Sequence, residues 1–322
     1  MRVLLAIFTL LLTLLPWTVT AESFRTVALT QIVEHPSLDA ARRGILDELA
    51  AAGFVQDQNL RVDYQNAQGN PATAAQIARK FVGDQPDVIV AIATSSAQTV
   101  AAATRDTPIV FCAVSDPIGA KLVKSLDQPG GNVTGTRDFP PIGEQLELIR
   151  KLSPDAKRLG VIYNPGETNS ISMIDTLKQL APDQGFKVIE AAAPKSGDVL
   201  SAARQLAGKV EAIYIPLDNT VVSALEAVIK VGREAKIPVY SADTDSVARG
   251  AVAALGFDYY DVGRQTGQQV VRVLRGEKPG DLPVERVRKL RLFLNPEAAA
   301  AMGVTLPDAV RQRAINLQKS AP

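Results

Sequence analysis

Residues 88–103 read VIVAIATSSAQTVAAA, and this stretch decides the fold class. Its first five residues are apolar at every position, as in a parallel strand that helices cover on both faces. Thr94, Ser95 and Ser96 follow as typical helix-opening residues, and an alanine-rich run continues from them. The stretch therefore predicts one strand–helix unit of a parallel α/β sheet.

Similar units lie on both sides of this stretch. In the first series, strands are expected near residues 27, 62, 89 and 110, and in the second near 161, 188, 213 and 239. Each step is about 25–35 residues, the size of a strand–helix unit. Between the two series lies PGGNVTG at 129–135, which we interpret as a Gly-rich crossing. Two such series predict two doubly wound parallel-sheet lobes.

The chain continues beyond the second series. A strand at 251–257, a helix at 261–274, a strand at 289–294 and a tail helix at 309–317 are expected there. These elements must return to the lobes, so a hinge of several crossings is expected near 135–140, 249–257 and 279–286. The expected N-terminal lobe comprises 22–137 plus about 252–280, and the C-terminal lobe comprises 138–251 plus about 281–322.

The first 21 residues predict an export signal. Arg2 provides the positive charge, Val3–Leu15 is apolar apart from two threonines, and Pro16 breaks the run. Small residues precede the expected cleavage site after Ala21. Since the apolar run is too short to span a bilayer comfortably and has no cysteine after it, a soluble periplasmic protein is expected rather than a lipoprotein.

Composition excludes several classes of function. Lys and Arg total 35 against 34 Asp and Glu, a balance without the basic excess of a nucleic-acid binder. Cys112 is the only cysteine and His35 the only histidine, which excludes an internal disulfide, a zinc cage and an iron–sulfur site. Neither a Walker sequence nor a G-x-S-x-G elbow occurs. We therefore expect no cofactor, no metal and no catalysis.

Polar residues gather directly after the expected strands of both series. In open α/β sheets ligands bind beyond these carboxyl ends, so a polar cleft between the lobes is predicted. Helix capping is the alternative explanation for each cluster taken alone. The ligand-binding candidates are Gln31, His35, Thr94, Ser95, Ser96, Ser115, Asp116, Asn164, Asn169, Ser170, Asp218, Asn219, Asp243 and Phe257.

Charge suggests how an amino-acid ligand would be held. Thr94, Ser95 and Ser96 open a helix, whose free N–H groups and dipole favour a carboxylate. An ammonium group needs a buried carboxylate, and Asp243 is preferred because it directly follows an apolar strand. Asp218 and Asp116 are the alternatives, and capping accounts well for Asp116. His35 is expected to contact the ligand rather than to act as a base. Possible ring neighbours are Phe139, Tyr163, Phe257, Tyr259 and Tyr260.

Several stretches carry a family resemblance, namely TQIVEHPSLDAARRGILDELAAAGF (30–54), VAIATSSAQ (90–98), IVFCAVSDPIGAKLV (109–123), PGGNVTG (129–135), GVIYNPGETNS (160–170), IPLDNTVVSALEAV (215–228) and SADTDSVARGAVAALGFDYYDVGRQTG (241–267). The chain resembles the solute-binding proteins of bacterial ABC transporters, in the group that includes tryptophan- and tyrosine-binding members. The resemblance implies a hinged, two-lobed type I binding-protein fold, export and no catalytic activity. It also implies an ABC permease and ATPase as partners, with the protein itself a monomer.

The leading hypothesis is thus a periplasmic binding protein that delivers a small solute, an amino acid, to an importer. Aromatic and branched-chain amino acids both stay open as ligands. A sensory module that passes its ligand signal to a membrane receptor needs the same cleft, so the sequence leaves it open. A secreted hydrolase or isomerase is disfavoured because the motifs for its chemistry are missing.

Overall fold

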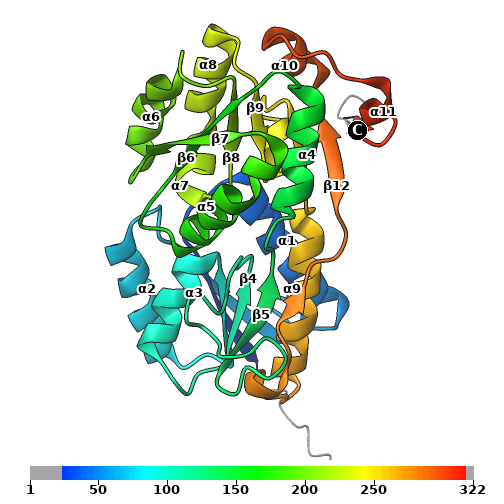
Figure 1. Cartoon of the computed structure of the whole chain (residues 1–322). Coiled ribbons are helices and arrows are strands. Elements are labelled where there is room, and N and C mark those ends of the chain that lie inside the picture. The colour runs from blue at the N-terminus through cyan, green and yellow to red at the C-terminus, as the bar shows by residue number, and fades with distance from the viewer. Residues whose placement is uncertain (1–23, 317–322) are drawn as a thin grey trace, which may run out of the picture.

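Two lobes with one sheet each make up the computed structural model, which describes residues 24–316 (Figure 1). The expected signal peptide lies outside these residues. Among residues 24–316, the strands form a six-stranded and a seven-stranded sheet. The predicted α/β architecture of two parallel-sheet lobes is confirmed.

The first sheet is parallel throughout its described pairs, in the order β11-β5-β4-β3-β1-β2. Its strands are β1 (Arg25–Gln31), β2 (Leu60–Asn66), β3 (Val88–Ile92), β4 (Ile109–Cys112), β5 (Val133–Arg137) and β11 (Glu285–Arg286). The helices of this first lobe are α1 (Pro36–Ala51), α2 (Pro71–Asp84), α3 (Thr94–Ala103) and α9 (Tyr259–Leu274). Helix α2 packs on α3, and α1 packs on α9 (Figure 1).

Helix α9 returns from the second half of the chain and lies very close to α1. A Cβ atom at Gly263 would lie 2.0 Å from the Ala41 carbonyl oxygen, and one at Gly44 would lie 2.2 Å from the Tyr260 carbonyl oxygen. Only glycine permits this approach of the two backbones. The C-terminal part of the chain is therefore anchored on the first lobe.

The second sheet has the order β13-β12-β10-β9-β8-β6-β7 and is parallel except where β10 meets β12. Its strands are β6 (Arg158–Tyr163), β7 (Lys187–Ala192), β8 (Ala212–Ile215), β9 (Val239–Ser241), β10 (Ala253–Gly256), β12 (Arg291–Leu294) and β13 (Ile315–Asn316). The helices of this second lobe are α4 (Ile142–Leu152), α5 (Thr168–Leu180), α6 (Val199–Leu206), α7 (Asn219–Ser223), α8 (Leu225–Ala235), α10 (Pro296–Ala301) and α11 (Asp308–Arg311).

Several local expectations are wrong. Residues 133–137 form β5 rather than a crossing, because the β-branched residues around Gly135 pair with β4. Gly135 permits this pairing, since a Cβ there would lie 2.1 Å from the Phe111 carbonyl oxygen. Between β8 and β9 the chain forms two helices, α7 and α8, with a break at Ala224, rather than the one helix of a simple strand–helix unit. The tail helix ends at Arg311, and β13 follows it.

Two short strands lie in the lobe opposite to the one that the expected lobe boundaries assign them to. Strand β10, expected with the first lobe, pairs beside β9 in the second sheet, because the apolar run Ala253–Gly256 continues that parallel sheet. Strand β11 was expected with the second lobe and pairs with β5 in the first. The remaining assignment of segments to lobes stays a prediction.

Candidate functional site

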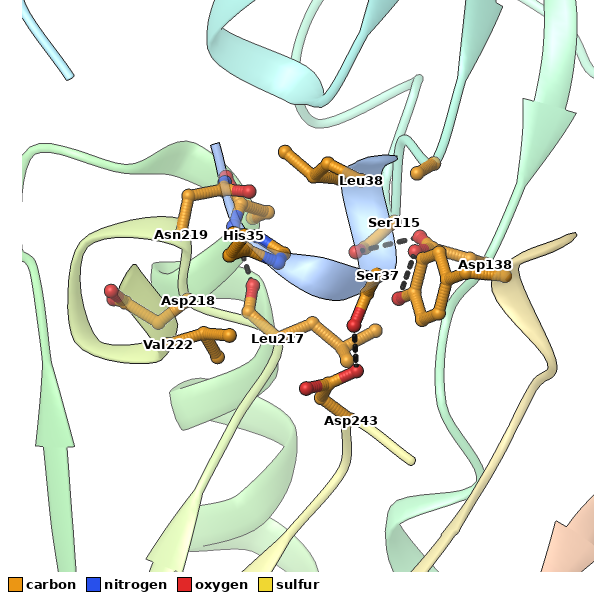
Figure 2. Close-up of a pocket in the computed structure, with 13 residues that line it drawn as sticks. His35, Ser37, Leu38, Ser115, Asp138, Leu217, Asp218, Asn219, Val222 and Asp243 are labelled. Atoms are coloured by element: carbon orange, nitrogen blue, oxygen red, sulfur yellow. Dashed lines mark hydrogen bonds between the residues drawn. The ribbon is translucent and has the colours of Figure 1, made fainter. Parts of the chain in front are cut away.

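A pocket lies between the lobes, where residues that follow strands of both sheets meet (Figure 2). This placement is the one expected for ligands of open α/β sheets. The lining residues are His35, Ser37, Leu38, Ala113, Ser115, Asp138, Asn169, Leu217, Asp218, Asn219, Val222, Asp243 and Tyr259.

One end of the pocket carries a buried carboxylate, Asp138, which directly follows β5. The Ser115 hydroxyl donates to its Oδ1 at 3.0 Å and the Tyr259 hydroxyl donates to its Oδ2 at 2.8 Å (Figure 2). Burial raises the pKa of the Asp138 carboxyl, although both hydrogen bonds lower it. Because a carboxylate accepts about four hydrogen bonds, Asp138 can accept more donors from a ligand.

A second carboxylate, Asp243, follows β9 and connects the lobes. Its Oδ1 accepts a hydrogen bond from the hydroxyl of Ser37, at the start of α1 in the first lobe (Figure 2). Its Oδ2 accepts from the backbone N–H of Ser246 at 3.1 Å and from the Ser246 hydroxyl at 2.6 Å. Asp243 is 2% exposed, so the charge lies in a nearly dry site.

A third carboxylate, Asp218, is bound within its own lobe. It accepts from the Asn164 backbone N–H at 2.6 Å, from the Ser170 hydroxyl at 2.7 Å and from the Val221 backbone N–H at 2.8 Å, where it caps α7. Burial, followed by the nearby charge of Glu167, raises the pKa of Asp218 to about 8. These contacts are those of a structural cap, one of the roles considered from the sequence.

The opposite end of the pocket carries amide and imidazole groups. Asn169 and Asn219 both donate side-chain hydrogen bonds to Oε2 of Glu167, at 3.2 and 2.7 Å. Asn169 Oδ1 and His35 Nδ1 are buried atoms without a hydrogen-bond partner among residues 24–316. Burial lowers the pKa of His35, which favours the neutral imidazole. This end therefore offers neutral polar atoms to a ligand.

Helix α3 begins close to this pocket. The residue before it, Ala93, donates its backbone N–H to the Cys112 carbonyl oxygen at 2.9 Å, and the next residue, Ala113, lines the pocket. Ala93 has a φ of 74°, which costs a non-glycine residue energy and is frequent at functional sites. Thr94 Oγ1 and Ser96 Oγ are each buried and have no partner within the described part of the chain. Two unpaired hydroxyls at a helix N-terminus are suited to an anion.

The lobes also touch along the rim of the cleft. The Ser172 hydroxyl of α5 donates to Asp116 Oδ2 at 3.0 Å, and Gln98 of α3 donates to the Thr168 hydroxyl at 3.2 Å. These contacts join side chains of the two lobes directly, without a ligand between them. Together with the bond between Ser37 and Asp243 they hold the lobes in a closed arrangement.

The structure brings together part of the predicted set. His35, Ser115, Asn169, Asp218, Asn219 and Asp243 line the pocket. The other eight candidates are absent from its described lining. Ser95 and Asn164 line a larger hollow next to it, Ser170 holds Asp218, and Asp116 lies at the rim.

Two further candidates, Gln31 and Phe257, have other surroundings. The Gln31 amide donates to the Val33 carbonyl oxygen at 2.8 Å and to Asp39 at 2.9 Å. Phe257 is buried in the core, and its carbonyl oxygen accepts from Thr244. The ligand role of all the candidates stays a prediction.

Sequence reasoning missed Ser37, Leu38, Ala113, Asp138, Leu217 and Val222, whereas Tyr259 was among the possible ring neighbours. Asp138 was missed because β5 was interpreted as a crossing, which hid that Asp138 directly follows a strand. Ser37 lies two residues after His35 and was not among the candidates. The apolar residues were missed because nothing in the sequence distinguishes an apolar side chain that lines a pocket from one that lies in the hydrophobic core.

Two features are absent from residues 24–316 of the structure. None of their helices has the length and hydrophobicity needed to cross a bilayer. Nor do three or more His, Cys, Asp or Glu side chains among them gather in a way that could hold a metal ion.

Comparison with known proteins gives a consistent result. A sequence model of the family described as ABC transporter substrate binding protein matches residues 26–318. The chain is 41% identical over 278 residues to a tyrosine-binding protein of Clostridioides difficile (strain R20291), an alignment that covers 86% of this chain and 81% of that protein.

Two solved structures are similar over 91% of this chain and 99% of their own. One is an ABC domain in complex with L-Trp from Streptococcus pneumoniae, with a TM-score of 0.89 and 37% identity. The other is the ligand-free, open structure of a substrate binding protein with adhesive properties from Clostridium difficile, with a TM-score of 0.69 and 40% identity. At similar identity, the lobes of this chain are arranged more like those of the L-Trp complex.

Proposed function

Because the chain belongs to the ABC transporter substrate-binding protein family, we propose that it binds tryptophan or tyrosine in the pocket between its lobes, for import across the inner membrane. It is a solute-binding protein of an ABC transporter with the type I periplasmic binding fold, not an enzyme. The observation that carries the proposed ligand is the superposition on the L-Trp complex, with a TM-score of 0.89.

The charges of the pocket support an amino-acid zwitterion. Asp138 and Asp243 are buried acidic side chains that face the pocket from the first and second lobes, and an ammonium between them could donate hydrogen bonds to both while its single positive charge balances one carboxylate. In the first sheet, β4 lies between β3 and β5. The start of α3 and Asp138 therefore flank the end of β4, so the ligand's carboxylate is proposed at the start of α3, where Thr94 and Ser96 lie just beyond the described lining of the pocket. This matches the site expected from the sequence, with Asp138 added.

The apolar lining supports an aromatic side chain. Leu38, Leu217 and Val222 line the pocket, and Figure 2 shows Leu38 and Leu217 between Asn219 and Asp138, with Val222 near Asp218. A ring extending from the head group at Asp138 and Asp243 would lie against these side chains and reach toward Asn169 and Asn219. Contact with three aliphatic side chains favours a large apolar ring over a small polar ligand.

A thermal-shift screen of the twenty amino acids tests this function. A ligand that binds only the folded state stabilises it by about 2.7 kcal/mol at a hundredfold excess over Kd. We expect the largest rises in melting temperature with L-tryptophan and L-tyrosine, and none with D-tryptophan as a stereochemical control. A response limited to branched-chain amino acids, or no response to any amino acid, would contradict the proposal.

Location and partners complete the proposal. Proteins of this family generally act outside the cytoplasm, and we propose the periplasm for this one, after cleavage behind Ala21. Residues 1–21 lie outside the described structure, so the support for this step is the sequence alone. The proposed partners are an ABC permease and its ATPase, which receive the ligand from the closed protein, itself a monomer.

A further inference from the structure

Asn169 has a side chain whose amide orientation is fixed by its neighbours. Its Nδ2 donates to the Leu217 carbonyl oxygen at 2.8 Å and to Glu167 Oε2 at 3.2 Å. Both partners are acceptors, so the amide nitrogen must point at them and the reversed orientation would place Oδ1 against two oxygens. Asn169 lines the pocket, and its Oδ1 is therefore the side-chain atom left for the pocket.

This oxygen is an acceptor without a donor. Asn169 is 3% exposed, and Oδ1 has no hydrogen-bond partner among residues 24–316. A buried acceptor that stays unpaired destabilises the structure that contains it. Glu167 also keeps Asn169 in place, since Thr220 donates to Oε1 at 2.9 and 2.7 Å and Asn219 to Oε2 at 3.1 and 2.7 Å. The site thus presents a fixed acceptor to whatever fills the pocket.

The donor that fits this position is on the ligand's ring. The ammonium is proposed at the other end of the pocket, between the carboxyl groups of Asp138 and Asp243. Asn169 shares its Glu167 partner with Asn219, and Figure 2 shows Asn219 on the side of the pocket away from Asp138. The indole N–H of tryptophan and the phenol O–H of tyrosine are both donors at the far end of an apolar ring, and phenylalanine has no such donor.

We propose that Asn169 Oδ1 accepts a hydrogen bond from the ring N–H or O–H of the ligand and thereby selects tryptophan and tyrosine against phenylalanine. This inference rests on the proposed function and adds the residue that sets its specificity. A pocket built to bond a ligand's N–H or O–H rejects an analogue without it, because the buried acceptor then stays unpaired.

The experiment removes the donor from the ligand before it changes the protein. Calorimetry on the full mature chain compares L-tryptophan with 3-(benzothiophen-3-yl)-L-alanine, in which sulfur replaces the ring N–H at almost the same shape. The same comparison is made between L-tyrosine and L-phenylalanine. We expect the wild-type protein to bind each donor-free analogue about 10- to 100-fold more weakly. Equal affinity for tryptophan and its sulfur analogue would overturn the inference.

The variant Asn169→Ala then tests whether this residue causes the difference. The tryptophan-to-analogue affinity ratio should fall to within about threefold of one, although overall affinity falls too. Thr176→Ala, on the outer part of the same helix, should keep the wild-type ratio. An unchanged ratio in Asn169→Ala would assign the residue a purely structural role and overturn the inference.

The design separates the two ideas. Binding of tryptophan without discrimination leaves the proposed function standing and removes the role of Asn169. Absence of binding by tryptophan and tyrosine overturns both. The wild-type comparison needs no variant, so it can overturn the inference even where Asn169→Ala fails to fold.

Discussion

Replacing Asp243 by asparagine should remove the ligand's charge partner while keeping the local structure. In the wild-type protein, Asp243 Oδ2 accepts from the backbone and the hydroxyl of Ser246, and Oδ1 accepts from Ser37. An asparagine can keep all three contacts, because its oxygen accepts from Ser246 and its nitrogen donates to the Ser37 hydroxyl, which can also act as acceptor. The substitution therefore tests the effect of the negative charge on ligand binding while the three hydrogen bonds are kept.

The expected loss follows from burial. Asp243 is 2% exposed, so an ammonium bound next to it is largely withdrawn from water. Removing one member of a buried charge pair costs about 3–5 kcal/mol. At about 1.4 kcal/mol per decade, Asp243→Asn should weaken amino-acid binding by roughly two to four decades. Ser37→Ala removes the hydrogen bond between the lobes but keeps the charge, and about a tenfold loss is expected from it.

Calorimetry with L-tryptophan measures these changes, and urea unfolding reports whether each variant is folded. Asp218→Asn is the matched control, because Asp218 is held by donors of its own lobe, and a smaller loss is expected there. Asp138→Asn is measured in parallel as the other carboxylate that faces the pocket. Affinity of Asp243→Asn within threefold of wild type would refute the assignment of the ammonium to Asp243.

Three further outcomes are expected. Protein purified from the periplasm should begin at Glu22, and N-terminal sequencing that finds Met1 would exclude cleavage. Small-angle scattering should give a smaller radius of gyration with saturating L-tryptophan, since a ligand that bridges the lobes favours the closed form, and an unchanged radius would argue against closure. Asp218 keeps its proton in the folded state up to a pKa of about 8, whereas the unfolded chain loses it near 3.8. Folding stability from this group therefore falls as pH rises between these values, and urea unfolding at pH 5 and pH 8 should show a smaller fall in Asp218→Asn.

The sequence predicted the fold from its most regular segments. The apolar run Val88–Ile92 is a fully buried central strand, as expected for a short apolar run in a parallel sheet that helices cover on both faces. Strand β5 was missed because glycines surround and interrupt it, so local composition indicated a turn. Its pairing depends on contacts with β4 that no local pattern contains.

The site was predicted in its placement more than in its members. Polar residues after strands pointed to the cleft, and six of the candidates line the pocket. The roles within that set depend on three-dimensional partners. Asp218 and Asp243 each follow a strand by two or three residues, yet Asp218 is held by its own lobe and Asp243 accepts from Ser37 of the opposite lobe. Which donors reach an oxygen is a property of packing that spacing along the chain does not encode.

Two rim contacts affect the apparent affinity of the protein for every ligand. They join Asp116 to Ser172 and Gln98 to Thr168. They stabilise closure equally for every ligand, because no ligand takes part in them. The apparent dissociation constant is the intrinsic one divided by the fraction of molecules that can close. Substitutions at the rim should therefore shift the working concentration range for all ligands together, while the ranking of ligands stays with the pocket. The overall affinity and the preference among ligands therefore depend on different residues, the first on the rim and the second on the pocket.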